Sequence, residues 1–218
     1  MDIFDIIGPV MIGPSSSHTA GAARIALAAR QIAGDRIKSA RILMHGSFAD
    51  TYKGHGTDKA VVGGLLGFKP DDPRLRDSME LAKAEGLDFS IVTADLGDVH
   101  PNTVRIETET AAGRRNSITG SSIGGGRIRI IRLNGMDVDF TGQYNTLVIS
   151  HCDRPGAVAA VTGILNRMDM NIAGMKVYRA AKGGDAAMII ETDQKPDRET
   201  LDEIRSLPEI TGVDYVFI

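Results

Sequence analysis

Hydrophobic positions follow a helical spacing in the first third of the chain. Residues 19–33 carry apolar side chains every three or four positions, which predicts an amphipathic helix that is capped by Ser17 or Thr19 and ends at Gly34. Further elements are predicted in order: a strand over residues 40–45, a loop over 54–57, and helices over 58–66 and 73–85.

The spacing changes to alternation from residue 89 onward. Five strands are predicted, over residues 89–93, 103–110, 117–122, 127–133 and 136–140. Asn134-Gly135 lies between the last two strands and is typical of a type I′ hairpin. The first region is therefore predicted to be an α+β domain with early helices and antiparallel strands.

A domain boundary is predicted at residues 141–143, between a domain of residues 1–142 and one of residues 143–218. In the second domain, strands are predicted over 146–151, 171–179, 186–191 and 212–217, and helices over 156–167 and 197–206. Lys182-Gly183-Gly184 supplies the central hairpin turn. This βαββαβ order is the ferredoxin-like pattern, so the expected fold class is α+β throughout.

Composition narrows the cellular setting. Of 218 residues, 42% are hydrophobic and 24% charged, as in ordinary globular proteins. No apolar run approaches the ~20 residues of a membrane helix, and the N-terminal MDIFDIIGPV lacks the basic segment of a signal peptide. The single cysteine excludes an internal disulfide, and also a metal site built from several cysteines of this chain alone. We expect a cytoplasmic protein in a reducing compartment, without a membrane partner.

Charge is spread evenly along the chain. Residues 1–142 contain 17 basic and 17 acidic side chains, and residues 143–218 contain 8 and 11. Neither part has the positive excess of a nucleic-acid-binding module, so no nucleic-acid partner is expected. Arg127, Arg129 and Arg132 in one predicted strand are interpreted as a solvated face or a partner contact.

Two short motifs carry the candidate chemistry: GPSSSHT at residues 13–19 and GHGTD at residues 54–58. Each combines small residues, hydroxyls and one imidazole in front of a predicted helix. Backbone N–H groups and hydroxyls at a helix start can hold a small anion such as a carboxylate. An imidazole beside them can move a proton near neutral pH. The motifs therefore predict part of an active site for a small polar acid.

These residues also admit other interpretations. The serines are ordinary helix caps as well. A serine hydrolase is disfavoured because the nucleophile elbow G-x-S-x-G is absent and adjacent Ser and His rarely have the required geometry. Neither His18 nor His55 has a second ligand at metal spacing, so no metal site is predicted in this chain. Gly124-Gly125-Gly126 precede an alternating segment, which favours a bulge or close backbone approach over a phosphate-binding loop.

The loop Asp153-Arg154-Pro155-Gly156 follows the first strand of the βαββαβ unit and resembles that of the ACT regulatory domain. Members of that family bind amino acids near this loop, often between paired domains. The resemblance implies a regulatory ligand at Asp153, Arg154, Pro155, Gly156 and Asn171, and self-association through this domain. The simpler interpretation is a tight turn with Pro at a helix start. Cys152 beside it is interpreted as a plain, partly buried thiol.

Taken together, GPSSSHT, HGSFADTYKGHGTDKA, the His-x-Asn of residues 100–102 and SIGGG resemble the β subunit of iron–sulfur-dependent L-serine dehydratase. The resemblance covers the whole chain. In single-chain members the cluster-binding cysteines lie on the same polypeptide, whereas the two-chain form has them on an α subunit. The resemblance therefore implies a [4Fe–4S] cluster on a partner α subunit, none on this chain, and L-serine as substrate.

The family reaction removes the α-proton and the β-hydroxyl of L-serine, and the resulting aminoacrylate becomes pyruvate and ammonia. An iron with an open position would act on the hydroxyl as a Lewis acid. By resemblance, His55 is the candidate base, and His18 with Ser15, Ser16, Ser17 and Thr19 would hold the carboxylate and amine. Gly54 and Gly56 would let the backbone approach closely, and Thr57 and Asn102 complete the expected binding set. Pro101 and Thr103 beside Asn102 depart from the form expected in single-chain members.

Two further functions are kept as alternatives. One is a regulatory or assembly subunit whose motifs only dock the partner. The other, which is weaker, is an independent serine hydrolase.

Overall fold

The computed structural model describes residues 9–218, so most of the N-terminal stretch examined for a signal peptide lies outside the described residues. The chain divides into two compact units, one ending at Thr141 and one beginning at Gly142. The sequence predicted the boundary at this point, and each unit is considered by itself below. Within residues 9–218, no helix is both long and apolar enough to cross a membrane.

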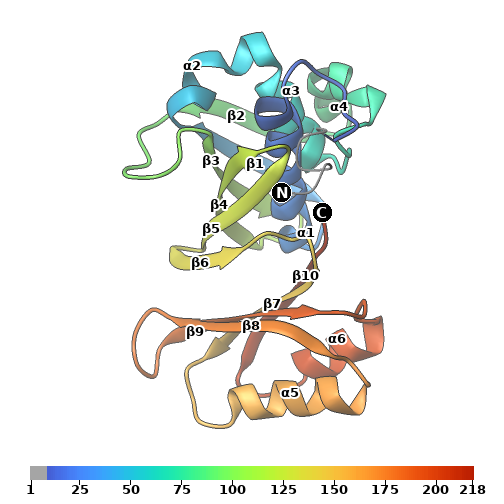
Figure 1. The fold of residues 1–218 in the computed structure, drawn as a ribbon, viewed down its shortest axis with the longest axis vertical. Helices are drawn as coiled ribbons and strands as arrows, with labels where there is room; N and C mark the ends of the chain where they lie inside the picture. The colour runs from blue at the N-terminus through green and yellow to red at the C-terminus, as the bar shows by residue number, and fades with distance from the viewer. Residues whose placement is uncertain (1–8) are drawn as a thin grey trace. The chain divides into compact units, whose positions relative to one another are not determined.

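The first unit contains helices and a six-stranded sheet (Figure 1). Its helical elements are η2 (Ser16–Gly21), α1 (Ala22–Ala33), α2 (Gly46–His55), α3 (Thr57–Leu65), η3 (Pro73–Asp77) and α4 (Ser78–Ala84). Its strands are β1 (Ile37–Met44), β2 (Asp88–Thr93), β3 (Thr103–Thr110), β4 (Arg115–Gly124), β5 (Arg127–Leu133) and β6 (Met136–Phe140).

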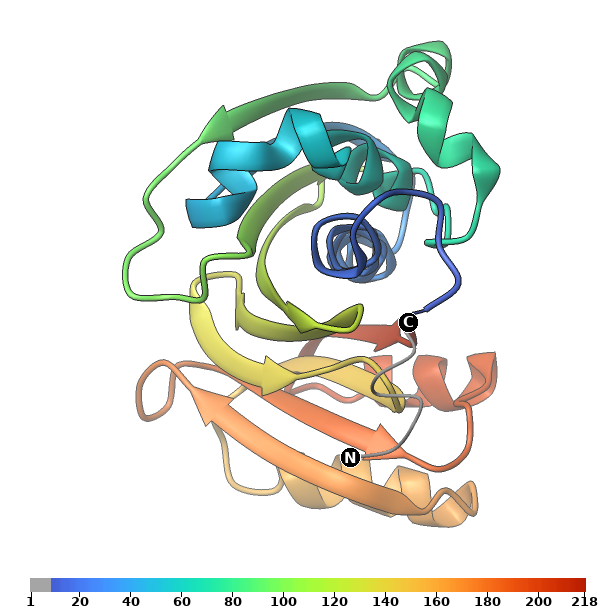
Figure 2. The ribbon, with the colours of Figure 1, turned by 45° about the horizontal axis from the view of Figure 1, so that its top comes forward.

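The sheet has the order β2-β1-β3-β4-β5-β6. All neighbours are antiparallel except β1 and β2, which pair in parallel with Ile42 opposite Ile91. The expectation of antiparallel strands therefore misses one pair. Parallel neighbours require a crossover connection, and the helices between β1 and β2 provide one. Figure 2 shows the strands curving around α1, which packs against β3 and β4.

The core of this unit lies between α1 and the sheet. Ile25 and Ile32 of α1 and Ile106 of β3 are almost fully buried. Burying a side chain of this size stabilises the fold by about 1.5–3 kcal/mol. The core thus fixes the face of α1 that points inward, and with it the direction of η2.

One observed helix was not predicted, and one predicted helix is divided in two. Residues 46–55 form α2, where the sequence predicted no helix and a loop over residues 54–57. The predicted helix over residues 73–85 is divided into the 3-10 helix η3 and the α-helix α4. In α2 only Phe48 is buried, so the periodic signal is weak there, and two glycines lower its helix propensity.

The late strands agree closely with the sequence prediction, and β3, β5 and β6 have the predicted bounds. Asn134 and Gly135 have positive φ angles of 50° and 84°, as a type I′ turn requires. Arg129 and Arg132 form ion pairs with acidic side chains of β6 at 2.5 and 2.9 Å, respectively. Both side chains are partly exposed, so these two arginines are compatible with a solvated face, and the alternative of a partner contact stays a prediction.

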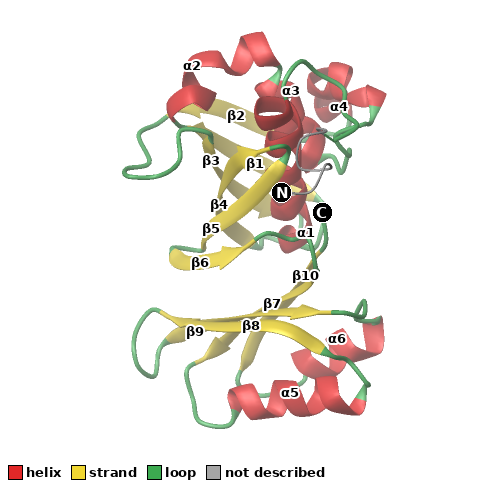
Figure 3. Ribbon diagram, viewed as in Figure 1, coloured by secondary structure: helices red, strands yellow, loops and turns green. Residues whose placement is uncertain are grey.

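The second unit contains β7 (Asn145–Cys152), α5 (Ala157–Arg167), β8 (Ile172–Arg179), β9 (Asp185–Thr192), α6 (Arg198–Arg205) and β10 (Ile210–Val216). Its strands pair in the antiparallel order β10-β7-β9-β8. Both helices cover one face of this sheet (Figure 3), where Leu147, Val161 and Met188 share one hydrophobic cluster. The ferredoxin-like prediction is confirmed.

Candidate active site

The hydroxyl-rich motif forms one wide helical turn. Residues Ser16–Gly21 adopt the π-helix η2, which continues directly into α1. Ser15 precedes it in an extended conformation, and its Oγ accepts a hydrogen bond from the N–H of His18 at 3.2 Å. The predicted start at Thr19 with Ser17 or Thr19 as cap is therefore wrong. The apolar periodicity begins only in α1, so it cannot predict the π-turn that precedes this helix.

Gly13 brings the preceding segment against this turn. Its φ is +137°, and a Cβ at this position would lie 2.6 Å from Cγ2 of Thr19. The N–H of Ile12 donates to the carbonyl of Pro70 at 2.7 Å, which fixes the segment to the loop after α3. A glycine is required here by both the dihedral angle and the close approach.

Both ring nitrogens of His18 are held by hydroxyl groups. Its Nδ1 lies 3.0 Å from Oγ of Ser17 and 3.4 Å from Oγ of Ser15. Its Nε2 lies 3.0 Å from Oγ of Ser47 in α2. The side chain is buried, and its ring contacts the edge of Phe48. Burial lowers the pKa of His18, and the nearby His55 lowers it further, so the ring is neutral at pH 7.

His55 ends α2 next to this ring. The centroids of the two imidazoles are 4.8 Å apart, with the planes at 66°. Gly56 follows in the left-handed conformation, with φ of 66°, and turns the chain from α2 into α3. Thr19 Oγ1 donates to the His55 carbonyl at 3.0 Å, which joins the two motifs directly. The structure therefore brings His18 and His55 together.

His55 differs from His18 in its hydrogen bonding. The Nδ1 atom of His55 is buried and has no partner in the described part of the chain. An imidazole nitrogen without a partner is available to exchange a proton with a bound molecule, provided that the molecule reaches it. Of the two imidazoles, His55 is therefore the one with a nitrogen that no described residue occupies.

The other predicted binding residues are distributed around the two rings. Ser16 is half-buried and makes no side-chain hydrogen bond with the residues described. Thr57 is fully buried, with an unpartnered Oγ1. A methyl group placed on Gly54 would have no atom of residues 9–218 within 4 Å, so the expected close backbone approach is not made within this part of the chain.

Asn102 lies in a turn against the start of α2. Its N–H donates to Nδ1 of His100 at 3.0 Å, and its carbonyl accepts from the N–H of Ser122 at 2.9 Å. A Cβ on Gly46 would lie 2.7 Å from the carbonyl oxygen of Pro101. The turn thus packs against the first residue of α2, and no hydrogen bond within the described residues joins Asn102 to either imidazole.

A small hollow opens beside His55, with a volume of about 200 Å³. Its lining includes Thr19, His55 and Gly56 together with the two basic residues Lys59 and Arg76. Sequence reasoning did not assign Ser47, Lys59 or Arg76. Ser47 and Lys59 lie inside the segment that carries the family resemblance, whereas Arg76 lies in η3, where no motif marks it.

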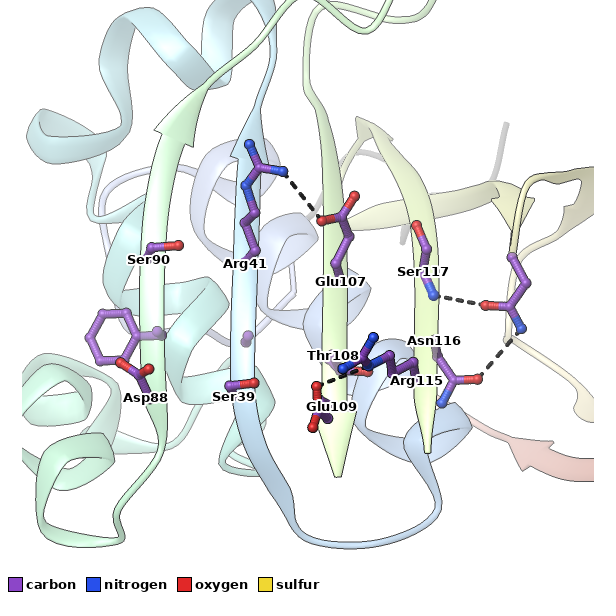
Figure 4. A pocket seen from close by; sticks show the side chains of 13 residues that line it. Ser39, Arg41, Asp88, Ser90, Glu107, Thr108, Glu109, Arg115, Asn116 and Ser117 are labelled. Atoms are coloured by element: carbon purple, nitrogen blue, oxygen red, sulfur yellow. Dashed lines mark hydrogen bonds and ion pairs between the residues drawn. The ribbon is translucent and has the colours of Figure 1, made fainter. Parts of the chain in front are cut away.

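A larger hollow of about 660 Å³ lies on the face of the six-stranded sheet that α1 does not cover (Figure 4). Two ion pairs lie in it. Nη1 of Arg41 is 3.6 Å from Oε2 of Glu107, and Nε of Arg115 is 3.0 Å from Oε2 of Glu109. Its charged groups therefore largely neutralise one another. Because no residue of the two motifs lines it, the candidate site is the smaller hollow.

The described residues form neither the triad of a serine hydrolase nor a metal site. Ser17 is within reach of His18, but the opposite nitrogen contacts the Ser47 hydroxyl, where a triad would have a carboxylate. Within residues 9–218, no three His, Cys, Asp or Glu side chains gather to hold a metal ion. Cys152 is a free, half-buried thiol at the end of β7. The described residues therefore fit neither a hydrolase triad nor an iron–sulfur cluster.

The hairpin between β4 and β5 contains the triple glycine. Gly124, Gly125 and Gly126 all have positive φ angles, of 97°, 60° and 74°. The carbonyl of Gly126 accepts from Nη1 of Arg24 at 2.8 Å. The glycines thus form a tight turn, and a register irregularity in β4 lies beside it.

In the second unit, the loop over residues 153–156 is fixed at one end. The Asp153 carboxylate accepts from the N–H of Gly183 at 3.0 Å and from Arg179 at 3.3 Å. These contacts lower the pKa of Asp153, and the hydrogen bond from Gly183 has the largest effect. Arg154, Pro155 and Gly156 are exposed in this loop.

Asn171 lies at the opposite end of the sheet from that loop. Its side chain donates to Asp193 at 2.7 Å, next to the end of β9, whereas the loop contacts the turn at the start of β9. One copy of the chain therefore does not bring Asn171 together with residues 153–156.

Comparisons with known proteins match both units. The family described as "Serine dehydratase beta chain" matches residues 1–85, and the ACT domain family matches residues 144–209. The chain is 45% identical over 214 residues to the probable L-serine dehydratase beta chain of Bacillus subtilis (strain 168), covering 98% of this chain and 97% of that protein.

Two other proteins are also similar in sequence to this chain. The L-serine dehydratase beta chain of Peptoniphilus asaccharolyticus is 40% identical over 215 residues, covering 98% of this chain and 96% of that one. The D-3-phosphoglycerate dehydrogenase of Bacillus subtilis is 27% identical over 164 residues, which cover 72% of this chain and 30% of that enzyme.

Proposed function

Because the chain belongs to the family of L-serine dehydratase beta chains, we propose that it completes the active site of an enzyme that converts L-serine to pyruvate and ammonia. The observation that supports this most directly is the pair of imidazoles, 4.8 Å apart, beside a small hollow. Two motifs separated by more than 30 residues meet there.

In this proposal His55 takes the α-proton of L-serine. Loss of that proton and of the β-hydroxyl gives water and aminoacrylate, which tautomerises and takes up water to give pyruvate and ammonia. The neutral His18, held by Ser17 and Ser47, provides a fixed surface against which the His55 ring lies. A neutral neighbour also allows His55 to become cationic when it takes the proton, since two adjacent positive charges would repel.

We also propose that a second, α subunit carries the [4Fe–4S] cluster that the family resemblance implies. This chain offers one cysteine, and its described residues do not gather a ligand set. Three thiolates are needed to hold a cluster that keeps one iron open to substrate. The proposal assigns this chain the proton transfer and substrate positioning only.

Reconstitution of the two subunits tests the function. The purified chain is expected to be colourless and inactive on L-serine, and to yield pyruvate and ammonia after anaerobic mixing with its cluster-bearing partner. Dehydration of L-serine by the isolated chain would contradict the two-subunit proposal. An αβ complex that assembles but is equally active when both motifs are altered would favour the alternative of a purely regulatory or assembly subunit.

Substitution of His55 tests the base. In the assembled complex, His55→Gln is expected to lower kcat by about 10²-fold or more, the scale of a lost general base. Exchange of the substrate α-proton with solvent, followed by NMR, should fall in parallel. Asp50→Asn, at an exposed position of the same helix, is the control. Undiminished α-proton exchange in His55→Gln would exclude this role.

For the second unit, we propose that the loop over residues 153–156 receives a small amino acid or a monovalent cation, with a second copy of the chain closing the site. The separation of Asn171 from this loop within one copy supports a paired arrangement. A ligand that prefers the paired state shifts the complex toward it by its differential affinity.

A further inference from the structure

Two cationic side chains and no carboxylate line the hollow beside His55. Lys59, from the first turn of α3, and Arg76, from η3, both line it, and no Asp or Glu is among its lining residues. Neither cation forms an ion pair with the residues that the structure describes. Both side chains are exposed, so they are free to meet an incoming anion.

Asp58, the acid next to Lys59 in sequence, interacts electrostatically with the Lys59 charge but forms no ion pair with it among the described residues. Asp58 Oδ1 accepts from the N–H of Lys59 at 2.8 Å, and its carboxyl is outside the lining of the hollow. This contact occupies an N–H group at the start of α3. An anion in the hollow would therefore be recognised by the two side chains and not by the helix end.

Three of the four hydroxyl groups that were expected to hold the substrate carboxylate are already engaged within the described residues, and only that of Ser16 is not. Ser15 and Ser17 contact His18, and Thr19 donates to the carbonyl of His55. A hydroxyl has a single proton to donate, and that of Thr19 is used within the chain. Lysine and arginine donate several charged hydrogen bonds each, and arginine matches the two oxygens of a carboxylate.

We propose that Lys59 and Arg76 form the carboxylate subsite of the active site and place a small amino acid with its α-carbon toward His55. This assignment rests on the proposed function and replaces the serine loop as the carboxylate receptor. The hollow, at about 200 Å³, lies below the 300–1,000 Å³ range of sites for drug-sized ligands, which fits a substrate of a few heavy atoms. The ligand class is therefore a small α-amino carboxylate.

The test compares charge-neutral variants in the assembled αβ complex. Lys59→Gln and Arg76→Gln are each expected to raise KM for L-serine by about tenfold or more, the scale of one lost charge-assisted hydrogen bond. The double variant should raise it further with a smaller effect on kcat. Lys83→Gln, at an exposed position of α4 outside the hollow, is the matched control.

Competition by L-serinamide, which lacks the carboxylate charge, separates this subsite from other roles. The wild-type complex should bind L-serine more tightly than L-serinamide, and the double variant should lose that preference. An active double variant that keeps the full preference would overturn the assignment. So would a weakened αβ affinity with unchanged KM, which would instead place the two cations against an acidic surface of the partner. Failure of the wild-type complex to dehydrate L-serine is a separate result, because it overturns the proposed function itself.

Discussion

The two imidazoles of the candidate site differ in their hydrogen bonds. His18 is held on both nitrogens, whereas His55 keeps one buried nitrogen without a partner among residues 9–218. Ser47 is decisive for this difference because it is the contact of His18 that comes from another helix. Without it, the Nε2 atom of a buried ring would lose its partner.

Ser47→Ala is expected to lower the free energy of unfolding by about 1–3 kcal/mol, the cost of an unsatisfied buried polar atom. Urea unfolding of the isolated chain measures this. Ser90→Ala is the control, because Ser90 is exposed on the opposite face of the sheet. Equal stability of the two variants would show that the Ser47 hydroxyl does not hold the ring.

The lowered pKa of His18 predicts a pH dependence of stability. The unfolded chain binds a proton near pH 6.5, while the folded chain resists it, so this group destabilises the fold as pH falls from about 6.5 through the lower folded pKa. Its stabilising contribution is fully present above that window. The wild type should therefore lose more stability than His18→Gln between pH 8 and pH 5. Parallel stability curves for the two proteins would refute the burial effect.

At the scale of elements, the packing of α3 on α1 depends on a residue without a side chain. A Cβ at Gly64 would lie 2.4 Å from the carbonyl oxygen of Ala23 and 2.6 Å from Cβ of Ala26. The small residues of α1 thus allow the close contact that places Lys59 and His55 beside η2. Because Lys59 of α3 lines the hollow, moving α3 away from α1 would also change the hollow.

Two glycine-to-alanine substitutions in helices are expected to have opposite effects. Gly64→Ala should destabilise the chain by about 1–3 kcal/mol through overpacking. Gly163→Ala in α5 should stabilise it by up to about 1 kcal/mol, because the nearest atom to the new methyl is 3.9 Å away and alanine favours the helix. Thermal unfolding of both variants decides this, and destabilisation by Gly163→Ala would contradict it.

Regular elements were predictable from the sequence where one period dominates. The alternation of β3, β5 and β6 and the turn at Asn134-Gly135 defined these strands to the residue. The helix α2 was not predictable in this way, since it buries only Phe48. The parallel pairing of β1 with β2 depends on tertiary packing that no local pattern records.

The candidate site was predictable in its motifs but not in its contacts. The two imidazole motifs were recognised in the sequence, and the structure places them 4.8 Å apart. No local pattern connects Ser47 with His18, because 29 positions separate them. Arg76 reaches the hollow only through the position of η3, so its role depends on the fold.

At the scale of the whole molecule, the two units should be separable. Each has its own sheet and hydrophobic core, and the boundary follows β6, which closes the first sheet. We expect a chain truncated after Gly142 to fold and to bind its partner, but to lose the response to small amino acids or monovalent cations and to pair more weakly with itself.

Light scattering and rate measurements on the full-length and truncated complexes test this expectation. The truncated complex should have a lower mass and a rate that no longer changes with the effector. Identical mass and identical rate profiles would show that the second unit has no regulatory role.

The π-turn of η2 sets a constraint on sequence length. A π-turn accommodates one more residue than an α-turn, so the helical phase of His18 differs from that of α1. Each residue of an α-helix advances the phase by about 100°, and deletion of one residue from the turn would rotate His18 and the buried face of α1 relative to each other by a similar angle. Either the imidazole would leave the site or Ile25 would leave the core. Related chains that keep both the imidazole in the site and Ile25 in the core are therefore expected to keep the length of this motif, even where they carry single substitutions.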